Sequence, residues 1–259
     1  MKFGICGGVE IAAVAAAAGY DYIEMSVAGV LKPRESDAAF QAALPAVTHA
    51  ALPCRALNMF VPADLKITGA SVDLPALSAY VTTACQRARL AEIPLIVFGS
   101  GGARRIPDGY DRAAAHAQLV AFCRMLGPIA QANRVTIAVE PLCRAECNVL
   151  TSVGECAALV REVRQPAIRL LVDAYHWMKD DDAAADIVAN GALLAHAHLA
   201  TKANRTAPGA EECDLAPFFN ALKRSGYDGT LSIEGRIADP AADLPRALEL
   251  MQRLWRAAA

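Results

Sequence analysis

Short, almost uninterrupted apolar runs alternate with longer helical patterns along the whole chain. The short runs are rich in β-branched and aliphatic residues and predict eight strands. We expect these strands at residues 2–6, 20–25, 55–60, 94–100, 135–142, 168–175, 193–200 and 230–235. Runs without polar alternation are typical of strands that are covered on both faces, as in a parallel sheet.

The stretches between these runs are rich in alanine and leucine and predict helices near 9–18, 36–50, 73–91, 111–132, 153–164, 181–190, 214–225 and 241–257. Several of them follow a residue that can cap a helix: Ser36, Asp111, Ser152, Asp214 and Asp239. Eight strand-then-helix units predict a single (β/α)8 TIM barrel domain over residues 1–259. A doubly wound open sheet is the alternative.

One weak repeat supports a fold built from similar units. The segments AGYDYIEMS (18–26) and SGYDGTLSIEG (225–235) both run from a helix end through Gly-Tyr-Asp and a strand to a glutamate. Glycine suits the left-handed residue that follows a helix.

Composition narrows the functional classes. Hydrophobic residues make up 55% of the chain and charged residues 20%, which predicts a large core. The formal net charge of -2 offers no basic surface for nucleic acid. The eight cysteines contain no CxxC pair, so we expect reduced thiols and a cytoplasmic location. We find no pattern of a signal peptide or a membrane span.

Candidate chemistry lies where consecutive predicted strands end, which is where TIM barrels carry their active sites. The last four strands end in Glu140, Asp173, His198 and Glu234. These three carboxylates and one imidazole form an oxygen-rich set that favours Mn²⁺, Mg²⁺ or Co²⁺. Without a cation, such carboxylates would repel one another and take up protons.

Each of these residues also has a simpler interpretation when it is taken alone. Glu140 could be a helix cap or a surface group, and Asp173 could cap the next helix. His198 could be a hydrogen-bonded barrel histidine, and Glu234 could pair with Arg236 or another arginine at a strand end. Four consecutive strands that each end in a potential ligand favour the metal site.

At this point the chain resembles the xylose isomerase-like TIM barrels. The resemblance rests on VEPLCRAECN (139–148), DAYHW (173–177), HAHLATKANRTAPG (196–209) and SIEG (232–235), with LNMFVPADLKITG (57–69) after the third strand. It is strongest towards sugar isomerases and epimerases of the D-tagatose 3-epimerase and hydroxypyruvate isomerase kind.

The resemblance implies roles for individual residues. Glu140, Asp173, His198 and Glu234 match the family's metal ligands, with Mn²⁺ as the expected metal. Glu140 and Glu234 match the pair that moves protons. Glu146, His176 and Arg205 match positions that contact substrate oxygens, with His176 expected on the loop that leaves the sixth strand.

Two departures from the family pattern bear on this assignment. Cys143 stands where the family often has asparagine. The spacing from His198 to Arg205 is one residue longer than in the epimerases. Glu146 could instead pair with Arg144.

The expected reaction is ketose 3-epimerisation through a cis-enediolate, with two glutamates as acid and base. The same site could serve a hydroxypyruvate-type aldose–ketose isomerase or an inosose-type dehydratase, and an abasic-site endonuclease is a distant alternative. The expected partners are a small sugar or keto-polyol and further copies of the chain, as homodimer or homotetramer. We expect His196 to face the helices. Arg104 and Arg105 could hold a phosphate, but their loop follows the fourth strand rather than the seventh or eighth, which favours an unphosphorylated or carboxylated small sugar.

Overall fold

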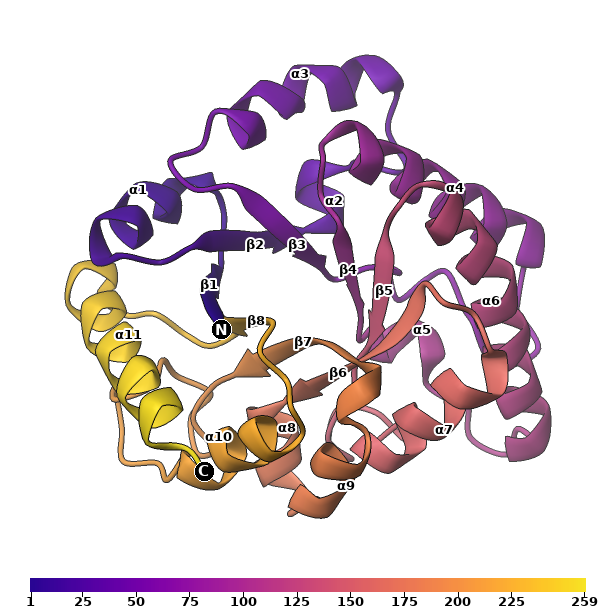
Figure 1. Ribbon diagram of the computed structural model, residues 1–259. Helices are drawn as coiled ribbons and strands as arrows, with labels where there is room; N and C mark the ends of the chain where they lie inside the picture. The colour runs from indigo at the N-terminus through magenta and orange to yellow at the C-terminus, as the bar shows by residue number, and fades with distance from the viewer.

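The computed structural model describes all residues, 1–259, and its core is a closed barrel of eight parallel strands. Figure 1 looks along this barrel, with the helices forming an outer ring. The strands are β1 (Lys2–Cys6), β2 (Tyr22–Ser26), β3 (Cys54–Asn58), β4 (Leu95–Phe98), β5 (Thr136–Val139), β6 (Ile168–Asp173), β7 (Leu194–Leu199) and β8 (Thr230–Ile233). Because β8 pairs with β1, the sheet has no edge, which excludes the open doubly wound alternative.

The predicted helices are all present. They are α1 (Val9–Ala18), α3 (Asp37–Thr48), α4 (Leu74–Leu90), α6 (Arg112–Ala132), α7 (Val153–Val163), α9 (Ala184–Ala189), α10 (Ala216–Arg224) and α11 (Pro240–Ala257). The sequence pattern did not predict three short helices at strand ends, α2 (Val27–Val30), α5 (Gly101–Arg104) and α8 (Ala174–Lys179), nor the 3-10 turn Gly191–Leu193.

Helix caps explain several of these boundaries. Ser36, Asp111, Ser152 and Asp239 each accept a backbone N–H in the first helical turn, as predicted. Asp214 lies one residue before the cap position of α10 and accepts the Ala216 N–H at 3.0 Å.

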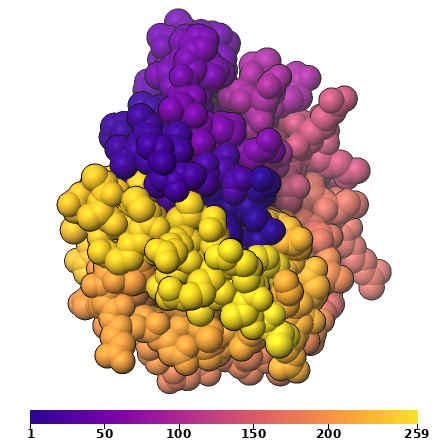
Figure 2. Space-filling view, turned by 60° about the vertical axis from the view of Figure 1, so that its left-hand side comes forward, coloured from indigo at the N-terminus to yellow at the C-terminus, as the bar shows by residue number.

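The core lies between the barrel and its helices, where most buried apolar side chains form one continuous cluster. The repeat at Gly-Tyr-Asp is structural, because Gly19 and Gly226 both adopt left-handed φ values, of 96° and 75°. The first and last helices lie side by side in Figure 2, where the indigo and yellow surfaces meet. No helix combines the length and the apolar character that a membrane crossing needs.

Candidate active site

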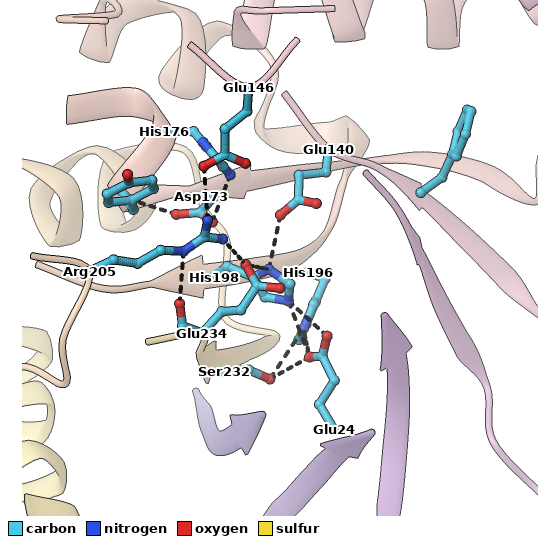
Figure 3. Close-up of polar contacts among 12 residues, drawn as sticks. Glu24, Glu140, Glu146, Asp173, His176, His196, His198, Arg205, Ser232 and Glu234 are labelled. Carbon is cyan, nitrogen blue, oxygen red and sulfur yellow. Dashed lines mark hydrogen bonds and ion pairs between the residues drawn. The ribbon is translucent and has the colours of Figure 1, made fainter. Parts of the chain in front are cut away.

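The last four strands bring their terminal polar residues to one point at the carboxyl end of the barrel. The ligand-capable atoms of Glu140, Asp173, His198 and Glu234 all lie within 4.8 Å of one another. His198 Nδ1 is central, at 3.0 Å from Glu140 Oε1 and 3.5 Å from Glu234 Oε2. Figure 3 shows the three carboxylates around this imidazole. The structure thus brings together the four residues that the sequence singled out.

Glu140, Asp173 and His198 are buried, the Glu234 side chain is 24% exposed, and the carboxylates repel one another. Burial, followed by the charge of Glu234, raises the pKa of Asp173 to about 6. The same two causes raise the pKa of Glu140. Burial also opposes ionisation of Glu234, but His198 and Arg205 outweigh it and lower the pKa of that carboxyl. The site therefore carries an excess of negative charge that a cation would relieve.

The hydrogen bonds of Asp173 show that the site can accept such a cation. Its Oδ1 caps α8 by accepting the Tyr175 N–H at 2.6 Å, as the simpler interpretation proposed. Its Oδ2 is buried and has no hydrogen-bond partner. A buried carboxylate oxygen without a partner is costly. Three carboxylates, among them that of Asp173 with its free oxygen, and one imidazole fit a hard divalent cation.

His176 directs a proton donor towards the same point. It lies in α8, so our expectation of a loop histidine was wrong: the backbone turns into a helix immediately after Asp173. Its Nδ1 accepts the Cys143 N–H at 3.1 Å, so the proton of the neutral ring is on Nε2. That Nε2 is buried without a hydrogen-bond partner, 3.8 Å from Asp173 Oδ2. Burial lowers the pKa of His176, which keeps the ring neutral.

Arg205 bridges the exposed Glu146 and the proposed metal ligand Glu234. Its guanidinium donates to Glu234 Oε2 at 2.6 Å and to Glu146 Oε1 at 3.1 Å. It also lies 4.6 Å from the centre of the Tyr175 ring. The longer loop between His198 and Arg205 therefore still delivers the arginine to the site, with a left-handed φ of 51° at Arg205.

Two alternative ion pairs that the sequence allowed, Glu146 with Arg144 and Glu234 with Arg236, do not form. Arg144 pairs with Asp180 at 3.5 Å rather than with Glu146. Glu234 pairs with Arg205, in the loop that follows β7, rather than with Arg236. Beside this pair is a cavity of about 490 Å³. Its lining residues are Cys6, Tyr175, Ala203, Asn204, Arg205, Glu234, Gly235 and Arg236.

Arg104 and Arg105 donate hydrogen bonds to backbone carbonyl oxygens of the segments that carry the site. Arg104 is completely buried and donates to the carbonyl oxygens of Phe98, Glu140 and Leu150. Arg105 donates to the carbonyl oxygen of Glu146 at 2.8 Å. Both guanidinium groups thus hold the segments that carry Glu140 and Glu146.

Inside the barrel, the sequence did not point to one polar residue, Glu24, and the predicted direction of another, His196, was wrong. Glu24, in the middle of β2, is completely buried and bonds both His196 and His198. The expectation that His196 faces the helices was wrong, because residues two apart in a strand share a face and His196 therefore points inward with His198. The repeat that aligns Glu24 with Glu234 was the signal that could have identified Glu24.

Comparison with known proteins agrees with this geometry. Residues 12–254 match the family model described as xylose isomerase-like TIM barrel. The chain belongs to this family. A relative from Methylomonas sp. (strain DH-1), named L-ribulose 3-epimerase, is 28% identical over 257 residues, covering 96% of this chain and 86% of the relative. A ketose 3-epimerase from Arthrobacter globiformis is 29% identical over 123 residues, covering 47% of this chain and 42% of the relative.

Solved structures of the family share the whole barrel. The D-psicose 3-epimerase from Clostridium cellulolyticum H10, described with D-tagatose, superposes with a TM-score of 0.83 over 98% of this chain and 99% of that one, at 18% identity. The D-allulose 3-epimerase from Methylomonas sp., in complex with D-allulose, superposes with a TM-score of 0.82 over 98% of this chain and 96% of that one, at 22% identity. At this level of identity, the likeness establishes a common fold.

Proposed function

We propose that this protein is a metal-dependent sugar epimerase that inverts C3 of a small ketose. The observation that carries the proposal is the placement of Glu140 and Glu234 beside one buried imidazole, His198 Nδ1, at 3.0 and 3.5 Å. Both relatives described above are named as 3-epimerases, which supports the same reaction. The net charge of -2 does not favour the endonuclease alternative.

Glu140, Asp173, His198 and Glu234 would hold the metal, and we propose Mn²⁺ because the donor set is hard and contains one nitrogen. The bound cation would polarise the ketose carbonyl and stabilise the charge that develops on its oxygen. Glu140 and Glu234 then act on the C3 proton from opposite faces: one carboxylate removes it and the other delivers a proton to the planar carbon.

The residues around the glutamates would orient the sugar. The Nε2–H of His176 is a buried donor without a partner, so it can bind a substrate oxygen next to Asp173. Arg205 bridges Glu234 and Glu146, and it holds Glu234 ionised while Glu146 offers an acceptor to a hydroxyl at the rim. We therefore assign substrate binding to Glu146, His176 and Arg205.

We also propose a cytoplasmic location, because all eight cysteines are unpaired and most are buried. The homodimer or homotetramer expected from the family resemblance stays a prediction.

The proposal is tested by incubating the Mn²⁺-loaded protein with a panel of ketoses in D₂O. We expect deuterium at C3 together with the inverted epimer. Deuterium at C1 or C2 with an aldose product would identify an isomerase instead, and an ultraviolet-absorbing dehydrated product would identify a dehydratase. The absence of exchange with every ketose would refute the proposal.

Two variants test the two-glutamate mechanism. Glu140→Gln and Glu234→Gln should each abolish epimerisation while the remaining glutamate still exchanges the C3 proton of one epimer only. The two variants should therefore label opposite epimers. Glu162→Gln, at an exposed glutamate on α7, is the control and should behave as wild type. Unchanged epimerisation in either site variant would contradict the assignment.

A further inference from the structure

A second layer of polar residues lies inside the barrel, directly beneath the proposed metal site. Its centre is Glu24, whose carboxylate accepts hydrogen bonds from three side chains of other strands. His198 Nε2 lies 3.0 Å from Oε1, His196 Nε2 lies 2.8 Å from Oε2, and Ser232 Oγ lies 2.7 Å from Oε2. In Figure 3, Glu24 lies on the opposite side of His198 from Glu140 and Asp173.

This arrangement determines which nitrogen of His198 can bind a cation. An ionised carboxylate can only accept hydrogen bonds, so the His198 nitrogen that faces Glu24 must carry a proton. The neutral ring then has its lone pair on Nδ1, the atom that faces Glu140 and Glu234. The opposite tautomer would place two acceptors against each other at Glu24 and direct an N–H into the cation site.

The surroundings of Glu24 fix the position of its carboxylate. Tyr22 Oη lies 2.9 Å from Ser232 Oγ, and His196 Nδ1 lies 2.7 Å from Thr230 Oγ1. The Tyr22 ring fits only because residue 4 is glycine, since a Cβ there would lie 2.3 Å from ring atoms. Four strands, β1, β2, β7 and β8, thus contribute to holding a charge that has no access to water, and such a charge is tolerated only with a full set of partners.

We propose that Glu24 is a positioning residue of the metal site, which fixes the orientation and the tautomer of His198 so that Nδ1 is presented to the cation. This inference rests on the metal site of the proposed function but not on the identity of the sugar. A carboxylate behind a ligating histidine typically changes metal affinity or activity by about 10–100-fold. A purely structural role for Glu24 would change stability without changing metal affinity.

Affinity for Mn²⁺ alone, measured by calorimetry without any sugar, separates these roles. Glu24→Leu removes the acceptor and should weaken Mn²⁺ binding by roughly 10–100-fold. Glu24→Gln keeps an acceptor but no charge and should recover part of the loss. Tyr20→Phe is the matched control: it removes a buried hydroxyl that donates to the Leu244 carbonyl oxygen, outside this network, and its Mn²⁺ affinity should equal that of wild type.

The wild-type protein provides a test that does not depend on the folding of any variant. With the diamagnetic probe Mg²⁺ bound, nitrogen-15 NMR of the histidine rings should show His198 protonated at Nε2 and unprotonated at Nδ1. A proton on Nδ1, or wild-type Mn²⁺ affinity in a folded Glu24→Leu variant, would overturn the inference. Wild-type protein that binds no Mn²⁺ would instead overturn the metal site of the proposed function.

Discussion

Replacing Gly99 with alanine should displace one carboxylate of the proposed site without disturbing the fold. Gly99 follows β4, and a Cβ built on it would lie 2.2 Å from Glu140 Oε2 and 3.4 Å from the carboxyl carbon of the same side chain. To reach ordinary contact distance, the oxygen must retreat by roughly 1 Å. The main chain of Glu140 cannot follow easily, because Arg104 holds its carbonyl oxygen at 2.8 Å.

The size of the effect follows from this displacement. A misplacement of about 1 Å in a catalytic group can cost roughly 100-fold in rate, which corresponds to about 2.7 kcal/mol of transition-state free energy. We therefore expect kcat/KM of Gly99→Ala to fall about 100-fold, with weaker Mn²⁺ binding. Gly99 does not have a left-handed φ, so alanine introduces no backbone strain there.

The assay compares kcat/KM on the best ketose, Mn²⁺ affinity and urea unfolding for Gly99→Ala and a matched control. The control is Gly154→Ala in α7, where the nearest atom to the new Cβ is Asp186 Oδ2 at 3.4 Å, an ordinary contact. It should keep wild-type activity. If Gly99→Ala retained activity within about threefold, equivalent to roughly 0.7 kcal/mol, the position of Glu140 would not matter for the reaction and its assignment would be wrong.

Two further predictions concern stability. Arg104→Met should lower the free energy of unfolding by at least about 3 kcal/mol, because three hydrogen bonds from a charged donor to carbonyl oxygens are lost. Urea unfolding measures this change, with Arg105→Met at the exposed neighbour as the control. An equally small change in both variants would contradict the prediction. Metal-free Asp173→Asn should be more stable than metal-free wild type above pH 6, by roughly 2–3 kcal/mol. The pKa of Asp173 is about 6 in the folded protein and near 3.8 when the chain is unfolded. As the pH rises between these values, the unfolded chain loses the proton first, so the folded wild type loses stability that asparagine keeps. The advantage should vanish below about pH 4; unfolding curves in EDTA that show the same difference at pH 4 and pH 8 would refute it.

The fold could be predicted because its strands are buried on both faces. Such strands appear in the sequence as continuous apolar runs, and apart from the six-residue α9, each predicted helix between them has nine or more residues and shows its own pattern. The short helices α2, α5 and α8 were missed because four to six residues cannot show a helical period, and such short helices are stabilised by tertiary contacts. Because α8 is too short to show a helical pattern, the sixth strand was predicted to run to residue 175. In the structure it ends at Asp173, which caps α8.

The four proposed ligands could be predicted from a positional rule, because each stands at the end of its strand. Glu24 could not, since it lies inside a strand and its partners come from β7 and β8, more than 170 residues away in the chain. Only barrel closure brings these strands together. The direction of His196 was mistaken for a different reason: strand alternation has a period of two, so His196 and His198 had to share a face.

The charges in the site explain why these side chains would need both a cation and a proton. Four carboxylates, those of Glu24, Glu140, Asp173 and Glu234, oppose the single guanidinium of Arg205. With His198 neutral as a ligand, the net charge of the site is three negative charges, and a bound divalent cation would reduce it to one negative charge. Uncompensated buried charge costs several kcal/mol, so one further proton is favoured. Because Arg205 donates to Glu234 and not to Glu140, this proton is favoured on Glu140. One glutamate is then an acid and the other a base, which is the state that proton transfer on two faces of a planar carbon requires.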